Sequence, residues 1–431
     1  TPEIAEAAGV SPGVIKGLAE QGALERVRRP VDLPFDTPDQ AAGGVTLSPS
    51  QRRAADALVQ RTIAQSFSVT LLNGVPGSGK TETYFEAIAA ALRCQRQVLV
   101  LLPEIALTVP FLDRFAARFG CRPAVWHSEM SAKERRRTWR GVATGKVRAL
   151  VGARSALFLP FSDLGLIVVD EEHDSAFKQE DGVIYHARDI AVVRASLANI
   201  PAILSSATPS LETVVNVDQG RYHQEHLVER HGGAHLPTIE AVDMRCDGPE
   251  PGNWLSPRGV RAVKDTLQRD EQALLFLNRR GYAPLTLCRS CGHRMRAPDT
   301  SSWLVEHRFS NRLICHQSGF SMAKPDACPN CGTKDALVGC GPGVERVAEE
   351  AAKIFPDANV AVISSDTLRG PAAVGELMQR MQEGDIDLLV GTQIVAKGYH
   401  FPNLTFVGIV DADLGLAGGD LRAAERTFQL L

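Results

Sequence analysis

A phosphate-binding loop is indicated by residue types and spacing early in the chain. Gly74 is followed by Gly77, Gly79, Lys80 and Thr81, which matches the pattern G-x-x-x-x-G-K-[ST]. Glycines allow backbone N–H groups to turn towards a polyphosphate, and the following helix N-terminus adds positive potential. We expect Lys80 to reach the β- and γ-phosphates and the Thr81 hydroxyl to ligate Mg²⁺. The predicted nucleotide contacts are Gly74, Val75, Pro76, Gly77, Ser78, Gly79, Lys80, Thr81 and Glu82.

An acidic cluster, Asp170-Glu171-Glu172-His173, follows the apolar run Leu166–Val169. An acid at the end of a buried strand, about ninety residues after a phosphate loop, suits a second magnesium anchor. We therefore expect Asp170 to hold Mg²⁺ and Glu171 to polarise the attacking water. His173 is placed to sense the γ-phosphate and to relay its presence to the next strand.

Two further sets of residues are expected to contact the acidic cluster or the nucleotide. Ser206 and Thr208 follow the buried run Ala202–Leu204, so their hydroxyl groups can hydrogen-bond to the acidic cluster and move when phosphate leaves. Gln51 lies about twenty residues before the loop and is placed to hydrogen-bond an adenine edge. An ordinary surface position on a helix is the alternative interpretation of Gln51.

The elements that position these residues form two sets of buried strands separated by helices, the pattern of α/β domains with parallel sheets. Polar residues cluster where the strands end, which is where ligands sit on such sheets. The first set comprises Val69–Leu72, Val98–Leu102, Ala149–Val151, Leu166–Asp170 and Ala202–Ser205. The second set comprises Gln272–Leu277, Val360–Ser364, Asp387–Val390 and Phe406–Val410.

Composition narrows the class of protein. The 431 residues imply about two to four domains, and 44% hydrophobic with 23% charged residues is ordinary for a soluble protein. A net charge of −3 excludes a bulk basic protein, so nucleic-acid binding must come from clusters such as Lys133–Arg140 and Arg279–Arg280. No apolar stretch approaches about eighteen residues, so no membrane segment is expected. Nine cysteines, several in C-x-x-C pairs, favour metal binding in a reducing compartment, with the cytoplasm as the expected location.

The N-terminal residues alternate short helical patterns with turn signals. Two small helices around Gly9-Val-Ser-Pro resemble the core of a winged helix. A small helical packing domain without DNA contact is an equally good interpretation. Residues 29–46 are rich in Pro, Asp and Gly and are typical of a linker. Because the first residue is Thr, we expect a fragment or a processed chain.

A Cys-containing insertion interrupts the second set of strands. Two intact knuckles, Cys288-Arg-Ser-Cys291-Gly and Cys328-Pro-Asn-Cys331-Gly, flank two segments that echo them. Those segments are Ala297-Pro-Asp-Thr300 and Cys315-His-Gln-Ser318-Gly. The sequence thus indicates a plan of four knuckles in which Ala297, Thr300 and Ser318 replace cysteines.

Taken in order, Gln51 and the motifs 74–81, 170–173 and 206–208 resemble the first lobe of a superfamily-2 helicase. Longer strings resemble the PriA family of bacterial replication-restart helicases over nearly the whole chain. These strings are Leu102–Thr108, Val151–Phe158, Asp170–Gln179, Phe276–Tyr282 and Gly391–Phe401.

The resemblance implies contacts with DNA. Thr108, Arg154 and Ser155 match motifs that grip the single-strand backbone. The stretch that contains Phe177 and Lys178 matches a loop that couples DNA contact to ATP hydrolysis. The Phe177 ring could stack on a base, although a core position is the more common role of such a ring. Thr392 and Lys397, with Gly391 and Gln393, match a second-lobe motif that touches DNA and nucleotide.

The resemblance also implies a zinc arrangement. In that family eight cysteines bind two zinc ions, one through the outer knuckles and one through the inner knuckles. Cys288, Cys291, Cys328 and Cys331 are therefore expected to hold one structural Zn²⁺. Since the inner pair keeps only Cys315, the second site should be empty. A repair of that site with His293 or His316 is the alternative.

The implied fold has two RecA-like α/β lobes with parallel sheets, a zinc module inserted in the second lobe, and an N-terminal segment like a winged helix. The expected divisions are 1–43 (winged-helix-like remnant and linker), 44–225 (first, ATP-binding lobe), 226–285 (start of the second lobe), 286–340 (zinc module) and 341–431 (remainder of the second lobe). In the family, the run Leu421–Leu431 leads into an arginine motif that reaches the γ-phosphate. With that motif absent, we expect a chain that binds ATP and DNA but hydrolyses ATP and unwinds DNA weakly.

The resulting hypothesis is an ATP-dependent 3′-to-5′ DNA helicase that recognises stalled or abandoned forks and starts primosome assembly. Its expected cofactors are ATP, Mg²⁺ and one Zn²⁺. Its expected partners are forked and single-stranded DNA, primosome proteins and single-strand-binding proteins, with the chain itself a monomer. The alternatives are a zinc-bearing, DNA-binding scaffold with impaired ATPase activity and another superfamily-2 translocase.

Overall fold

The computed structural model spans residues 1–431 and describes most of them. The residues outside its description are 1–3, 6–7, 25–33, 42, 104–108, 231–236, 251–252, 278–284, 289, 301–302, 308–311, 316–317, 341–342, 364–370, 393–400, 411 and 413–420. Several predicted residues fall in these ranges, namely Thr108, Arg279, Arg280, His316, Gln393 and Lys397.

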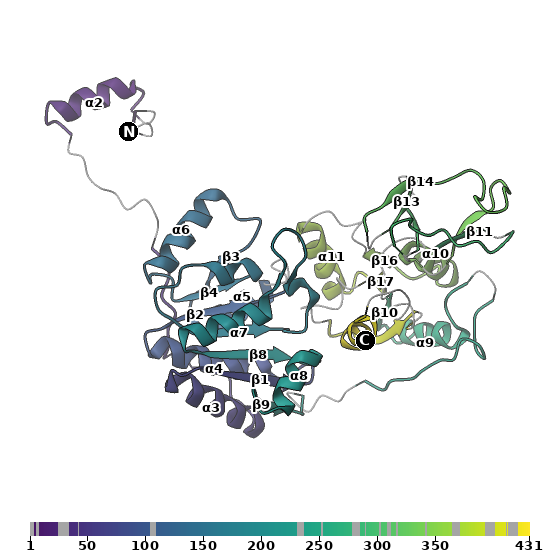
Figure 1. Cartoon of the computed structure of the whole chain (residues 1–431), viewed down its shortest axis with the longest axis horizontal. Coiled ribbons are helices and arrows are strands. Elements are labelled where there is room, and N and C mark those ends of the chain that lie inside the picture. The colour runs from purple at the N-terminus through teal and green to yellow at the C-terminus, as the bar shows by residue number, and fades with distance from the viewer. Residues whose placement is uncertain are drawn as a thin grey trace.

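The first lobe is built on a parallel seven-stranded sheet with the order β3-β4-β2-β5-β8-β1-β9 (Figure 1). Its strands are β1 (Ser68–Gly74), β2 (Gln97–Leu101), β3 (Ala124–Trp126), β4 (Ala149–Gly152), β5 (Leu164–Asp170), β8 (Pro201–Ser206) and β9 (His223–Leu227). Every strand predicted for the first set overlaps one of these strands. The sequence did not predict β3 and β9, which form the two edges of the sheet. Since β9 ends at Leu227, the sheet of this lobe extends beyond the predicted boundary at residue 225.

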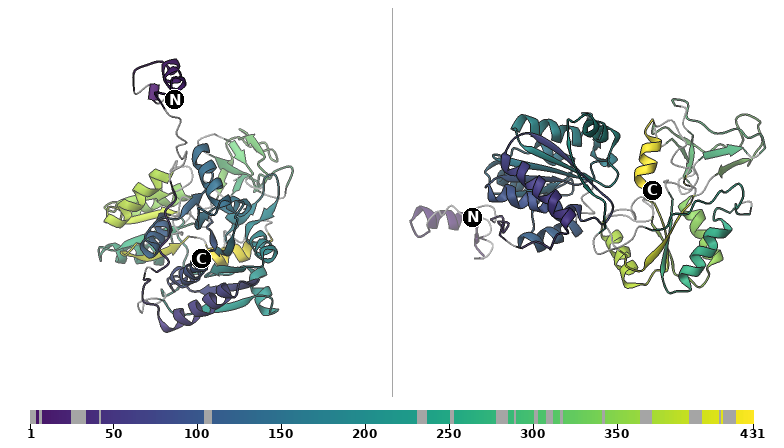
Figure 2. Two further views of the ribbon diagram at one scale, coloured as in Figure 1. Left: turned by 90° about the vertical axis from the view of Figure 1, so that its left-hand side faces the viewer. Right: turned by 90° about the horizontal axis from the view of Figure 1, so that it is seen from below.

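Helices cover both faces of this sheet (Figure 2). They are α3 (Pro49–Ala64), α4 (Lys80–Arg93), α5 (Val109–Phe119), α6 (Ala132–Ala143), α7 (Ala187–Ala198) and α8 (Leu211–Asp218). The largest buried rings lie between α4, α5 and the sheet, where Phe85 meets Phe111, Phe115 and Phe119 edge-on at 5.6–5.9 Å between ring centroids. A second core of buried aliphatic side chains covers the opposite face. The two cores hold the central strands β5, β8 and β1 rigidly in the sheet.

The second lobe has a smaller parallel sheet with the order β16-β17-β10-β18. Its strands are β10 (Gln272–Phe276), β16 (Val360–Ile363), β17 (Leu388–Gly391) and β18 (Leu404–Ile409). Its helices are α9 (Pro257–Leu267), α10 (Val344–Ile354), α11 (Pro371–Glu383) and α12 (Ala423–Leu430). The prediction of two α/β lobes with parallel sheets is confirmed.

The inserted module contains short antiparallel strands with a small core of its own. Strand β11 (Leu285–Cys288) pairs with β15 (Leu337–Cys340), and β13 (Arg312–Ile314) lies between β12 (Val305–His307) and β14 (Ser321–Ala323). At the N-terminus, α2 (Pro12–Glu20) stands apart from the first lobe in Figure 1. Across the described residues, we find no helix that combines the length and apolarity needed to span a bilayer.

Candidate nucleotide site and zinc centre

The phosphate loop joins the end of β1 to the start of α4. Gly77 and Gly79 adopt φ angles of +77° and +80°, a left-handed conformation that side chains disfavour. A Cβ atom on Gly74 would lie 2.5 Å from Ser78 Oγ, so the loop closes tightly on itself. Lys80 Nζ donates a hydrogen bond to the Gly74 carbonyl at 2.8 Å. The Lys80 side chain is therefore folded back onto the phosphate loop, and it must leave the Gly74 carbonyl to contact a bound phosphate.

Two buried hydroxyl groups, one in the phosphate loop and one at the end of β8, lack a hydrogen-bond partner among the residues that the structure describes. Among the described residues, Ser78 Oγ and Ser205 Oγ are buried side-chain atoms without a hydrogen-bond partner. Ser78 belongs to the loop, and Ser205 pairs in register with Asp170 on the neighbouring strand. Unpartnered buried polar atoms are uncommon and call for a ligand or water. The donor set at this edge of the sheet therefore fits a magnesium–nucleotide complex, with Thr81 and Asp170 as the residues that would hold the metal.

Gln51 lies against the phosphate loop. Its carboxamide oxygen accepts a hydrogen bond from the Ser48 backbone N–H at 2.8 Å, which completes a capping box at the start of α3. Its Nε2 donates to the Ser78 carbonyl, also at 2.8 Å. Both ends of the side chain are thus engaged within the protein, and adenine contact would require Nε2 to leave Ser78. That contact stays a prediction.

Asp170 is held at the end of β5 by two donors. The Tyr84 hydroxyl donates to Asp170 Oδ2 at 2.9 Å, and the Glu171 backbone N–H donates to Oδ1 at 3.1 Å. Tyr84 is fully buried, and burial together with the negative charge of Asp170 raises its pKa well above the ordinary value. The phenol therefore stays protonated and remains a donor to the carboxylate. The sequence analysis missed Tyr84, although its position one turn after Thr81 places both residues on one face of α4.

The rest of the acidic cluster turns sharply after the strand. Glu171 has a φ angle of +49°, and strained backbone of this kind is found mainly at functional sites. His173 Nδ1 lies 2.7 Å from Ser206 Oγ, which also accepts from the Thr208 backbone N–H at 3.0 Å. The acidic cluster at the end of β5 and the hydroxyl motif at the end of β8 are thus joined by direct hydrogen bonds.

Glu172 forms a buried network that the sequence analysis also missed. Its carboxylate has no exposed surface and accepts from the Ser210 backbone N–H at 2.7 Å and from Thr213 Oγ1 at 3.0 Å. Arg188 on α7 lies 3.3 Å from it and neutralises its charge. Burial opposes the charge of Arg188, but hydrogen bonds to Asp189 and the charge of Glu172 outweigh it and raise the arginine pKa. This network ties the acidic cluster to α7 and α8.

In the loop after the acidic cluster, the structure contradicts the predicted stacking of Phe177 on a base. The Phe177 ring is completely buried in the core of the first lobe, so it offers no surface on which a base could stack. The core interpretation of Phe177 therefore holds, and the stacking interpretation is wrong for this structure. Arg154 donates to the carbonyls of Ala176 and Lys178 at 3.1 and 2.7 Å, which fixes the loop to the preceding motif. Ser155 and Lys178 are exposed beside it, and Thr392 is buried at the end of β17.

Arg230 is a third residue that the sequence analysis missed. It follows β9 and donates from Nε to the Pro76 carbonyl of the phosphate loop at 2.9 Å. A Cβ atom on Gly77 would lie 3.3 Å from the same guanidinium nitrogen. A cation thus lies against the outer side of the loop. Only the tertiary pairing of β9 with β1 brings it there, which is why no local pattern indicated it.

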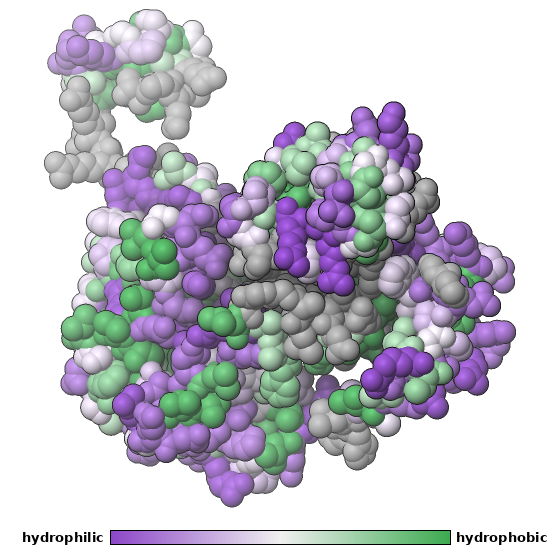
Figure 3. All heavy atoms as spheres, turned by 45° about the vertical axis from the view of Figure 1, so that its right-hand side comes forward, coloured by the Kyte–Doolittle hydropathy of each residue, from purple (hydrophilic) through white to green (hydrophobic). Residues whose placement is uncertain are grey.

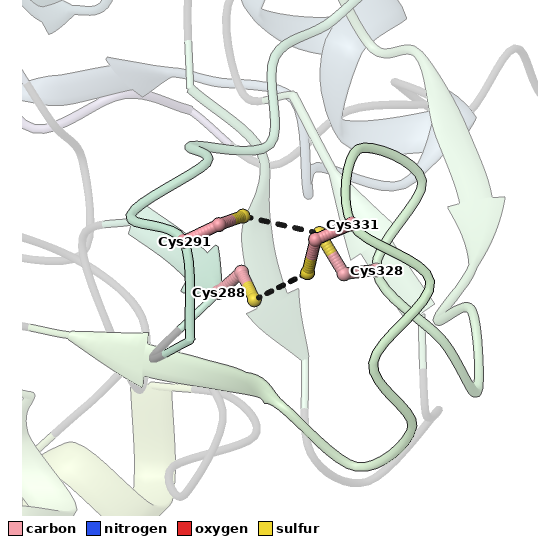
Figure 4. A group of neighbouring side chains, drawn as sticks. All are labelled: Cys288, Cys291, Cys328 and Cys331. Atoms are coloured by element: carbon pink, nitrogen blue, oxygen red, sulfur yellow. Dashed lines mark hydrogen bonds between the residues drawn. The ribbon is translucent and has the colours of Figure 1, made fainter.

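Four cysteines converge in the inserted module (Figure 4). The sulfur atoms of Cys288, Cys291, Cys328 and Cys331 all lie within 4.8 Å of one another, with Cys288–Cys331 and Cys291–Cys328 both at 3.7 Å. Sulfurs bound at about 2.3 Å to a tetrahedral zinc lie about 3.8 Å apart, so this geometry fits zinc. The hydroxyl group and backbone of Thr333 lower the pKa of Cys331 to about 6, whereas burial raises the pKa of Cys328 to about 11.

The inner knuckles share the backbone of the outer knuckles. Gly292, Gly319 and Gly332 each have a φ angle of 72–74° and each donate to the carbonyl four residues earlier. All four segments are flanked by an antiparallel pair seven residues apart. These pairs are Leu287–Arg294, Arg296–Trp303, Ile314–Ser321 and Ala327–Lys334.

The side chains of the inner pair meet as well. Thr300 Oγ1 lies 3.7 Å from Cys315 Sγ, the separation found between the cysteines of the outer site, and Ser318 Oγ donates to Asp299 at 3.1 Å. Ala297 and Cys315 are buried in the module core. The inner knuckles therefore pack together through hydroxyl, methyl and thiol groups.

Two lobes with parallel sheets, a phosphate loop and an acidic cluster joined to the next strand form the architecture of superfamily-2 helicases. The sequence model of the DEAD/DEAH box helicase family matches residues 48–217. Among solved structures, that of RecG bound to a three-way DNA junction superposes with a TM-score of 0.50 and 15% sequence identity, covering 90% of this chain and 45% of RecG. This likeness concerns the fold alone.

Curated sequences identify the branch of the superfamily. The chain is 44% identical over 421 residues to the replication restart protein PriA of Rickettsia felis, a match covering 96% of the chain and 64% of that protein. It is 38% identical over 433 residues to PriA of Bacillus subtilis, covering all of the chain and 54% of that protein. The chain therefore belongs to the PriA family and spans less than two thirds of the length of these relatives.

Proposed function

We propose that this chain is the ATP-driven motor of a 3′-to-5′ DNA helicase that acts at stalled or abandoned replication forks. The family assignment supports the restart role, since the relatives are named replication restart proteins. The polarity, the fork preference and the assembly of primosome and single-strand-binding proteins on the chain are part of this proposal. So is the binding of one structural zinc by the four converging cysteines.

One observation carries the motor proposal. The hydrogen bond between His173 and Ser206 joins the nucleotide edge of β5 to β8, whose other neighbour is the phosphate-loop strand β1. A change at the γ-phosphate position can therefore reach two adjacent strands without passing through flexible chain. Such a direct connection is what converts nucleotide state into movement in a two-lobe motor.

The residues then have these roles. Lys80 leaves the Gly74 carbonyl and donates to the phosphates, while Thr81 and Asp170 would hold a Mg²⁺ that would neutralise phosphate charge. Glu171 orients and deprotonates the attacking water; its carboxylate is half-exposed and lies 3.6 Å from His173 Nδ1. His173 reports the presence of phosphate to Ser206. Arg154 transmits DNA contact through the loop at residues 176–178.

The test combines nucleotide binding, ATP hydrolysis and strand separation. A fluorescent ATP analogue should bind in a magnesium-dependent manner, and single-stranded DNA should stimulate ATP hydrolysis. A duplex with a 3′ single-stranded tail should be unwound in preference to one with a 5′ tail. Lys80→Ala should reduce hydrolysis at least about 100-fold, because it removes the cation that contacts the transferred phosphate. Equal hydrolysis by Lys80→Ala, or the same rate with and without DNA, would rule out the motor proposal.

A further inference from the structure

Helix α6 carries a concentration of positive charge that the nucleotide site does not use. Its twelve residues include five cations and a single acid. The cations are Lys133, Arg135, Arg136, Arg137 and Arg140. The acid, Glu134, is committed to the helix itself, because its carboxylate accepts from the Ser131 backbone N–H at 3.0 Å and from Ser131 Oγ at 2.7 Å.

The packing of α6 determines which side chains face solvent. Thr138, Gly141 and Val142 are buried against the lobe, and a Cβ atom on Gly141 would lie 2.5 Å from the Phe35 ring. The helix therefore cannot rotate without a clash. At 100° per residue, Lys133, Arg136 and Arg140 lie on the opposite side in a single row with spacings of three and four residues.

The N-terminal part of this row, Lys133 and Arg136, carries an electrostatic cost for the helix. Like charges three or four residues apart destabilise a helix, and cations in its first turns oppose the helix dipole. Within the described part of the chain, neither Lys133 nor Arg136 has an acidic partner that would offset this cost. A polyanion that binds the row would offset it.

An exposed tryptophan stands beside the row. Trp139 lies one turn after Arg136, and 49% of its surface is exposed. Figure 3 shows hydrophilic side chains gathered at the top of the first lobe, at the height where Figure 1 labels α6. A flat amphipathic ring beside a line of guanidinium groups is a surface suited to sugar and phosphate.

The position of α6 separates it from the ATP site. The helix packs on β3, the edge strand, and four strands lie between β3 and the phosphate-loop strand β1. With strands about 4.8 Å apart, the two regions are about 24 Å from each other across the sheet. A ligand on α6 is thus independent of the nucleotide.

We propose that the row Lys133–Arg136–Arg140, with Trp139 at its side, binds the phosphate backbone of double-stranded DNA, as a holding surface for a duplex arm of the substrate. A duplex fits better than a single strand, because single-strand platforms alternate several aromatic rings with cations whereas α6 offers one ring beside a straight row of charge. This inference rests on the proposed function, since it assigns a second DNA contact to the same motor.

The test uses the triple variant Lys133→Gln/Arg136→Gln/Arg140→Gln. Its affinity for a blunt duplex should fall at least about tenfold at low salt, and the slope of log affinity against log salt should decrease in magnitude by about 3. Affinity for oligo-dT and ATP hydrolysis without DNA should stay within about twofold. Duplex binding should quench tryptophan fluorescence, and Trp139→Phe should remove most of that quenching.

The matched control removes the same charge elsewhere. Arg261→Gln/Lys264→Gln/Lys353→Gln changes three exposed cations on α9 and α10 and should leave duplex affinity unchanged. Circular dichroism should confirm that both triple variants are folded.

Two outcomes would overturn the inference: unchanged duplex affinity in the α6 variant, or equal losses of duplex affinity in both triple variants. If the unsubstituted chain bound neither oligo-dT nor duplex, the proposed function would fail as well. If the unsubstituted chain binds oligo-dT and hydrolyses ATP, but the α6 triple variant keeps the full duplex affinity, this inference alone is refuted.

Discussion

Side chains that lie behind the nucleotide site matter as much as the motif residues themselves. Asp170 has the right type and place in the sequence to anchor magnesium, but its orientation comes from the Tyr84 hydroxyl and the Glu171 N–H. Tyr84 is fully buried on α4, so it positions the carboxylate without reaching the ligand. The hydrogen bond directs the remaining lone pairs of Asp170 towards the space beside the phosphate loop.

Replacing this tyrosine should weaken metal binding. Tyr84→Phe removes a hydrogen bond to a charged group, which contributes about 1.5–3 kcal/mol, or roughly 10- to 100-fold in affinity. We expect Mn²⁺ binding in the presence of a non-hydrolysable ATP analogue, measured by electron paramagnetic resonance, to weaken by at least about tenfold. Tyr222→Phe is the control, because it removes a phenol hydroxyl from a partly buried position elsewhere in the same lobe. Equal metal affinities for the two variants would show that Tyr84 does not position Asp170.

Functional residues could be predicted where they belong to a short motif, and not where distant parts of the chain supply their contacts. The phosphate loop, the acidic cluster and the hydroxyl motif could be found because each is a short string with a fixed spacing. Gln51 was found for its expected adenine contact, whereas the structure shows it capping α3 and contacting Ser78. The contacts of Arg230 and Glu172 could not be predicted, because tertiary packing supplies them: β9 carries Arg230 to Pro76 of the phosphate loop, and α7 and α8 supply the partners of Glu172.

At the scale of elements, the inner and outer knuckles show how one backbone plan can be stabilised in two ways. The outer pair brings four sulfurs to the spacing of a zinc site, and the inner pair keeps the same hairpin register with hydroxyl and methyl groups. The inner segments therefore keep the flanking antiparallel pairs and bring Thr300 and Cys315 together.

Restoring the ligands should restore a site. We expect the unsubstituted chain to contain about one zinc, and Ala297→Cys/Thr300→Cys/Ser318→Cys to contain about two, because Cys315 would then face three further thiolates. Inductively coupled plasma mass spectrometry would give the stoichiometry. Adding Cys315→Ser to the triple variant should return the zinc content towards one ion per chain. A content of one zinc in the triple variant would mean that the inner knuckles are not arranged around a common centre.

Strand prediction failed at the two edges of the first-lobe sheet, β3 and β9, although both edge strands of the second sheet, β16 and β18, were predicted. Central strands such as β5 and β8 are unbroken apolar runs, because helices cover both of their faces. Strand β9, His223-Gln-Glu-His-Leu227, is mostly polar and has a covered neighbour on one side only. Strand β3 has three residues, too few for a period to be recognised. An apolar run in the sequence indicates a buried strand. The edge strands β3 and β9 are only partly buried, so they lack this signal.

The molecule as a whole has separate cores for the two lobes and the inserted module. The module core contains Cys288, Cys315 and Cys328 and shares no residue with the cores of the first lobe. Loss of zinc should therefore be felt locally. A zinc ion held by the four cysteines would therefore stabilise the module without taking part in nucleotide chemistry.

The double variant Cys288→Ser/Cys331→Ser tests this separation. It should lose its zinc and unfold the module, seen as increased hydrogen exchange over residues 285–340, because structural zinc supplies folding free energy directly. Affinity for the magnesium–ATP analogue should stay within about twofold of the unsubstituted chain. Cys94→Ser/Cys246→Ser, at two exposed cysteines outside the module, should change neither quantity. A fall in nucleotide affinity that tracks the loss of zinc would contradict the separation of the cores.

The sheet order of the first lobe has a consequence for synthesis on the ribosome. Strand β1, which leads into the phosphate loop, lies between β8 and β9, whose residues begin at 201 and 223. Strands β2 to β5 can pair with one another as soon as they emerge, but β1 has no neighbour until β8 has been made, and its other edge stays uncovered until β9 follows. At about 5–20 residues per second, the nascent chain carries an unpaired phosphate-loop strand for several seconds or longer. The phosphate-loop strand is therefore paired on both sides, and the sheet of the first lobe complete, only after residue 227 has left the exit tunnel.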